Sequence, residues 1–105
     1  MALTRDFKET VKARVSADPT FRAALLTEAV ELLLSGDVAT GKAVLRNYIN
    51  ATIGFESLAG DVGNPSKSLM RMFGPAGNPT ANKLFAVLQA VQKSEGIALT
   101  VSAAR

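Results

Sequence analysis

The polar side chains of this chain that could make specific contacts are lysines, arginines, amides and hydroxyls, which bind partners more often than they catalyse reactions. None of the 105 residues is a histidine or a cysteine. This removes the commonest general base, the thiolate nucleophile and the usual zinc ligands. Glu28 and Glu31 share a helix face, but no other acidic residue is placed to join them, so neither a metal site nor a cofactor is expected. Tyr48, the only tyrosine, lies on an apolar stripe and is interpreted as a packing residue. We therefore expect that the chain is not an enzyme.

Positive charge gathers in the second part of the chain. From Val62 onward there are five basic residues and one acidic residue, a net charge of +4, whereas residues 1–61 carry seven basic and eight acidic residues, a net charge of −1. The whole chain thus has a net charge of +3. This distribution favours an anionic partner for the second part, although a bias of this size also arises by chance.

Two groups of candidate contact residues lie in that basic part: Ser66, Lys67, Met70 and Arg71, then Asn78, Thr80, Asn82 and Lys83. Arg71 is the best candidate for a base edge, because its guanidinium can contact guanine through two hydrogen bonds. Ser66 and Lys67 suit phosphate or base contacts, and Met70 suits either a thymine methyl or the rim of a core or dimer interface. The second group begins a helix, where the positive end of the dipole favours phosphate, with plain capping or solvation as the alternative.

The stretch Phe55–Phe73 must position the first group. It is predicted to form two short helices, with the small residue Ala59 where they cross and a turn at Gly63, since glycine tolerates a positive φ. Asn64 is expected to cap the second helix, Pro65–Phe73, with Pro65 at its first position. With Leu69 and Met72 inward, the four candidates face outward. Such a pair either places a helix in the major groove of DNA or only packs in a core.

The rest of the chain predicts further helices and one strand. The helix from about Val38 to Ile53 is expected to expose Lys42 and Arg46. The tail has apolar residues at alternate positions, which is typical of a strand. The predicted helices cover residues 4–17, about Pro19 to Leu34, about Val38 to Ile53, and from the Asn78-Pro79 start to about Ser94; the strand covers Ile97–Val101.

Two of these elements predict a homodimer. The helix from Pro19 to Leu34 is apolar nearly all round, which indicates burial on several sides, either in the core or against a second subunit. A lone strand at Ile97–Val101 also needs a partner edge, from a second copy of the chain or from a partner protein. No apolar run reaches the roughly 20 residues that span a bilayer, and the first residues do not form a secretory signal. We therefore expect a cytoplasmic location and no membrane partner.

Residues 54–101 resemble a known family. The segment SLAGDVGNPSKSLMRMFGPAGNPTANKLFAVLQAV is similar to the lambda-repressor-like (XRE-type) helix-turn-helix of addiction-module antidote (antitoxin) proteins. The matching pieces are Leu58 with Ala59, Gly63, Ser68 with Leu69, and the run Gly77–Pro79. The family usually has an apolar residue and a serine where this chain has Asn64 and Pro65. The resemblance implies a transcriptional repressor that binds an inverted-repeat operator in double-stranded DNA, and an antitoxin with a cognate toxin protein as partner.

Taken together, these patterns predict an all-α domain of about six helices with a short C-terminal β-strand. Residues 1–105 are expected to form a single domain, with N-terminal helices at 1–53, the helix-turn-helix core at 54–95, and the strand and tail at 96–105. The alternative function is a protein-interaction module in which the helix pair is only scaffold.

Overall fold

The computed structural model describes residues 13–15 and 17–104. Its helices are α2 (Pro19–Leu34), α3 (Val38–Ala51), α4 (Phe55–Val62), α5 (Ser66–Met72) and α6 (Ala81–Glu95). The predicted all-α class is therefore confirmed. The helix predicted over residues 4–17 lies mostly outside the described residues, and within them 13–15 and 17 are helical.

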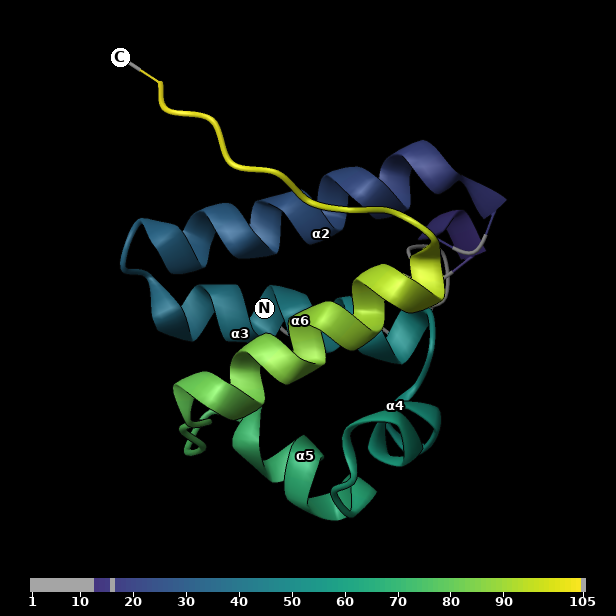
Figure 1. The fold of residues 1–105 in the computed structure, drawn as a ribbon, viewed down its shortest axis with the longest axis vertical. Helices are drawn as coiled ribbons and strands as arrows, with labels where there is room; N and C mark the ends of the chain where they lie inside the picture. Colours follow the sequence, from purple (N-terminus) through teal and green to yellow (C-terminus); the bar gives the residue numbers. More distant parts are fainter. Residues whose placement is uncertain (1–12, 16, 105) are drawn as a thin grey trace, which may run out of the picture.

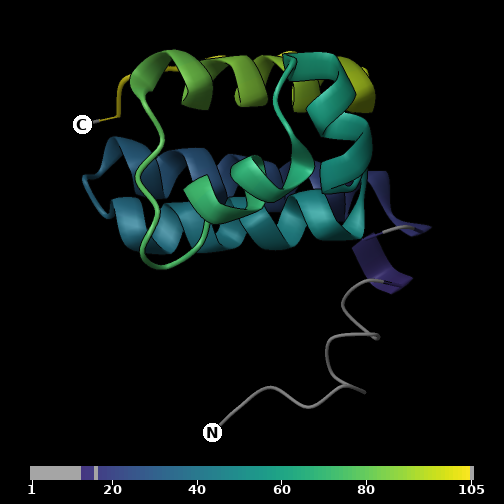
Figure 2. The same cartoon turned by 90° about the horizontal axis from the view of Figure 1, so that it is seen from below.

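The first two complete helices form an antiparallel hairpin. Asp18 caps α2, because its carboxylate accepts hydrogen bonds from the backbone N–H groups of Thr20 (3.0 Å) and Phe21 (3.2 Å). Asp37 caps α3 through the Thr40 N–H (3.2 Å). Gly36, with φ of 94°, makes the tight turn between the two helices. As a result α2 and α3 lie side by side in both views (Figures 1 and 2).

One apolar core joins this hairpin to the other helices. Leu26 and Ala29 of α2 meet the buried side chains of α3, α4, α5 and α6, including Leu45, Leu58 and Leu69. The Phe55 and Phe73 rings, 6.5 Å apart between centroids, pack the start of α4 against the end of α5. In Figure 1, α4 and α5 lie at one end of the molecule, below α3 and α6.

α2 is less central than its apolar sequence suggests. Leu26 and Ala29 are its fully buried residues, whereas Leu34 is 67% exposed. Within the single chain α2 is thus only partly covered, with Leu25 and Val30 also packed against the core, and its packing on a second subunit stays a prediction.

The prediction of a C-terminal strand is wrong. Residues 97–104 form an extended segment, and the described part of the chain contains no strand. The segment leaves α6 after Gly96 and runs along α2 (Figure 1). Ile97 and Leu99 pack on the core, and the Leu99 N–H donates to the Gln92 side-chain carbonyl at 2.8 Å. The alternating apolar residues therefore place one face of the tail against the helices. The side chain of Gln92 supplies the hydrogen bond that a neighbouring strand would otherwise make.

Candidate nucleic-acid interface

The outward face of α5 carries most of the first group of candidate residues. Leu69 is fully buried and Met72 packs against the core, so both point inward as predicted. Lys67, Met70 and Arg71 are exposed, Met70 by 50%, while Ser66 is half-buried. One side of this short helix is therefore anchored, and the other presents two positive charges and a thioether to solvent.

The turn before α5 forms at Gly63, as predicted. Gly63 has φ of 71° and its N–H donates to the Ala59 carbonyl (2.9 Å), which ends α4. The predicted cap is wrong, because Pro65 occupies the cap position and α5 begins at Ser66. Asn64 is engaged elsewhere: its side-chain oxygen accepts a hydrogen bond from the Lys83 ammonium.

The loop after α5 is closely packed. A Cβ atom at Gly77 would collide with the carbonyl oxygens of Arg71 and Met72, so only glycine fits there. Lys42 of α3 reaches this loop, and its ammonium donates to the carbonyls of Gly74 (3.3 Å) and Gly77. Lys42 is only 8% exposed, so its predicted place on the solvated side of its helix is wrong.

The sequence contained a signal for the burial of Lys42. Lys42 lies three residues before Leu45 and seven before Ile49, and this spacing places all three on one helical stripe. Leu45 and Ile49 are both fully buried, and the same spacing applies to the lysine stem. The charge at its end, rather than its place on the helix, led to the wrong prediction.

The second group of candidate residues surrounds the start of α6. The predicted start at Asn78-Pro79 is wrong, because Thr80 is the cap and α6 begins at Ala81. The Thr80 hydroxyl accepts the Lys83 N–H at 3.2 Å, and the Lys83 ammonium is bonded to Asn64. Asn78 and Asn82 remain exposed. The Lys83–Asn64 bond brings the start of α6 next to the start of α5.

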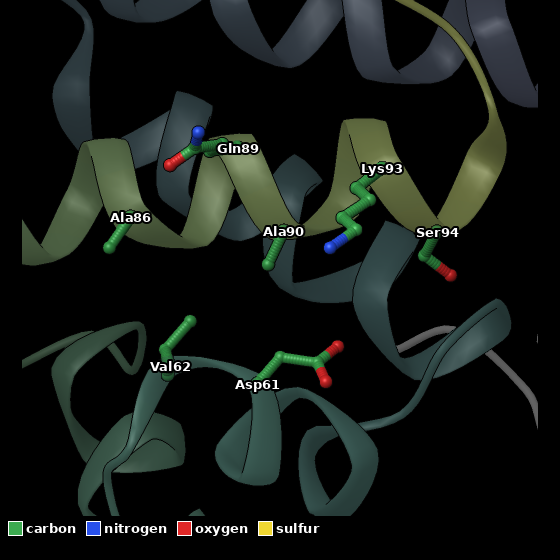
Figure 3. Close-up of a pocket in the computed structure, with 7 residues that line it drawn as sticks. All are labelled: Asp61, Val62, Ala86, Gln89, Ala90, Lys93 and Ser94. Carbon is green, nitrogen blue, oxygen red and sulfur yellow. The ribbon is translucent and has the colours of Figure 1, made fainter.

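A groove of about 660 Å³ lies between α4 and α6 (Figure 3). Its lining combines one acidic and one basic side chain with an amide and with small or apolar side chains: Asp61, Val62, Ala86, Gln89, Ala90, Lys93 and Ser94. Asp61 and Lys93 lie across it from each other, on different helices. They are 32 positions apart in the chain, so no local pattern predicts this groove. Within the described ranges, no group of three or more acidic side chains could hold a metal ion, there or elsewhere.

A buried polar network lies at the far end of α6. The Glu95 carboxylate accepts hydrogen bonds from the Arg22 guanidinium (2.7 Å) and from the Tyr48 hydroxyl (3.1 Å). Arg22 also donates to the Val15 carbonyl at 2.9 Å. Burial raises the pKa of Tyr48, and the neighbouring Glu95 carboxylate raises it further. Tyr48 therefore stays protonated and ties α3 to α6, which agrees with a packing role.

None of the described helices is long and apolar enough to cross a membrane. Comparison of the chain with protein-family models, with curated proteins and with solved structures found no match.

Proposed function

We propose that this chain is a sequence-specific DNA-binding protein and a transcriptional repressor, in which α4 and α5 form a helix-turn-helix and α5 enters the major groove. The observation that carries the proposal is the two-sided character of α5. Leu69 fixes one side in the core, while Lys67, Met70 and Arg71 stand free on the other. A helix held in this way can present its outer face to a groove of matching width.

Each outward side chain has a contact that suits its chemistry. The Arg71 guanidinium can donate two hydrogen bonds to one guanine, and Lys67 can neutralise a phosphate. Met70 suits an apolar contact with a thymine methyl, and Ser66 suits a phosphate oxygen. Near the start of α6, Asn78 and Asn82 are free to contact the backbone, whereas the Thr80 hydroxyl and the Lys83 ammonium already have partners in the protein.

The first test is binding to duplex DNA as a function of salt. Each phosphate neutralised lowers the slope of log affinity against log salt by about 0.9, so a few contacts give a steep dependence. We expect a slope of about −2 or steeper for the parent protein, and a shallower slope for Lys67→Ala. Lys93→Ala, which removes an exposed charge from α6, serves as the matched control. Binding that is absent at low salt would contradict the proposal.

We further propose that the protein acts as a homodimer on an inverted repeat. Exposed apolar side chains support this step: Leu34 is 67% exposed, Val38 44% and Val101 77%. The α2–α3 turn and the end of the tail lie at the same end of the molecule in both views (Figures 1 and 2). Two-fold symmetry would cover these residues in both copies and place two α5 helices about 34 Å apart, one turn of DNA.

Light scattering tests the dimer. The parent should have twice the mass of the chain at tens of micromolar, and Leu34→Asp or Val101→Asp should lower that mass, since a charge at an apolar contact is costly. Both side chains are exposed in the single chain, so these variants should still fold. A parent protein that remains monomeric would contradict the proposal.

An antitoxin role is proposed on the resemblance of residues 54–101 to addiction-module antidote proteins. The partner would be a toxin encoded by a neighbouring reading frame. Expression of that neighbour alone should arrest growth, and co-expression of this chain should restore it. Growth that is unaffected by the neighbour, or arrest that this chain does not relieve, would contradict the role.

A further inference from the structure

Lys42 is a buried charge with an unusual set of partners. A buried ammonium is costly unless acceptors surround it. The acceptors here are two backbone carbonyls, those of Gly74 (3.3 Å) and Gly77, and within the described residues no carboxylate pairs with it. The charge of Lys42 is therefore directed at one short piece of backbone, the loop 74–77.

That loop is in direct contact with the end of α5. The Gly74 N–H donates to the Arg71 carbonyl at 3.1 Å, and the Gly77 N–H donates to the Gly74 carbonyl at 3.0 Å. Gly77 also lies so close to the Arg71 and Met72 carbonyls that no Cβ fits. A continuous set of contacts thus runs from Lys42 on α3, through the loop, to the backbone of Arg71.

A second lysine holds the other end of α5. Lys83 of α6 is half-buried and donates to the side-chain oxygen of Asn64, which immediately precedes the cap residue Pro65. The segments that flank this helix of 7 residues are therefore each bonded to a lysine from a different helix.

We propose that Lys42 and Lys83 are positioning residues that fix the pose of α5, and that Lys42 thereby governs base discrimination without touching DNA. This inference rests on the proposed function of α5 as the DNA-reading helix. Base contacts require side chains to be held within about 0.5 Å, whereas phosphate contacts fix position but carry no sequence information. Loss of Lys42 should therefore lower the preference for an operator more than it lowers the affinity for DNA in general.

The test uses Lys42→Met, which keeps the stem and removes the charge. Lys93→Met is the matched control, because it removes a charge from an exposed lysine that does not contact α5. Two measurements are made on each full-length protein. One is amide hydrogen exchange, which needs no DNA. The other is the ratio of affinities for an operator selected in vitro with the parent and for a scrambled duplex of the same composition.

We expect Lys42→Met to speed exchange at Phe73, Gly74 and Gly77 while amides of α2 keep their protection. The affinity ratio should fall about tenfold, with affinity for the scrambled duplex within about twofold of the parent, since a tenfold change lies within the discrimination that one good base contact contributes. Lys93→Met should leave both measurements unchanged. Lys83→Met should speed exchange instead at Asn64 and Leu69, at the start of α5.

Unchanged exchange at Gly74 and Gly77 in Lys42→Met would overturn the positioning role. Faster exchange with an unchanged affinity ratio would overturn the role in discrimination. A parent protein that binds no duplex would remove the proposed function, while the exchange data would still decide whether the two lysines hold α5. Should Lys42→Met fail to fold, Lys42→Gln, which keeps a hydrogen-bond donor, takes its place with the same expected directions.

Discussion

The two ends of α5 are built on different principles. The turn before it needs glycine for its backbone conformation, since Gly63 has φ of 71° and a Cβ there would meet nothing within 4 Å. The loop after it needs glycine for space, since Gly77 lies against the carbonyls of Arg71 and Met72. The two lysines that bond to these flanking segments differ in burial: Lys83, before α5, is half-buried, and Lys42, after it, is buried. The glycine before α5 thus serves a local backbone conformation, whereas the glycine after it serves close tertiary packing.

The largest effect should come from Gly77→Ala. The added Cβ has backbone atoms in its way on α5, which cannot move aside as a flexible side chain would. We expect a loss of about 2–3 kcal/mol in the free energy of unfolding, measured by urea denaturation. Gly60→Ala in α4 is the control, because a Cβ there meets nothing and alanine favours a helix, so its stability should not fall. If Gly77→Ala were as stable as the parent, the close packing of the loop would be refuted.

A smaller effect is expected from Gly63→Val. There is room for the side chain, so the cost is the strain of a β-branched residue at positive φ, about 1–2 kcal/mol. Thermal melting followed by circular dichroism measures it. Gly63→Asn should cost less, because asparagine adopts this conformation more readily. A valine variant that melts at the parent temperature would show that the turn does not depend on positive φ.

The smallest effect concerns Tyr48, away from both ends of α5. Tyr48→Phe removes the hydrogen bond to Glu95 and should cost about 1 kcal/mol at neutral pH, with DNA binding unchanged. The pKa of Tyr48 is raised in the folded protein, so its contribution to stability is complete below the unfolded pKa of about 10 and is lost as pH rises above it.

The alkaline range gives a clean measurement of this contribution. Urea denaturation between about pH 9 and 11 should show a steeper loss of stability in the parent than in Tyr48→Phe. The chain has one tyrosine and no tryptophan, so ultraviolet absorbance follows this ionisation directly. Ionisation of the folded protein near pH 10 would contradict the buried hydrogen-bonded state of Tyr48.

Local signals in the sequence predicted a large part of the fold. The predicted start of α2 at Pro19 and the predicted turn at Gly63 are both confirmed, because caps such as Asp18 and positive-φ glycines act on neighbouring residues. The inward direction of Leu69 and the outward direction of Arg71 followed from helical spacing.

What the sequence did not predict depends on contacts between distant residues. Asn64 is not a cap because Lys83, 19 residues later, takes its side chain. Helical spacing places the Lys42 stem on the buried stripe of α3, but the carbonyls of Gly74 and Gly77 that accept from its ammonium lie 32 and 35 residues away. The apolar side chains of the tail, Ile97 and Leu99, pack on the core, and the Leu99 N–H donates to the Gln92 side chain rather than to a second strand. No local propensity encodes such partners.

The proposal that α5 reads DNA is tested most directly by comparing Arg71→Ala and Arg71→Lys on an operator selected with the parent and on a scrambled duplex. We expect Arg71→Ala to lose about 1–3 kcal/mol of binding free energy on the operator and to relax the preference at one base pair in each half-site. Arg71→Lys should keep affinity for scrambled DNA but not recover the operator preference, because a lysine lacks the planar fork. Lys67→Ala should weaken both targets alike. Equal affinity of Arg71→Ala and the parent for the operator would contradict the account.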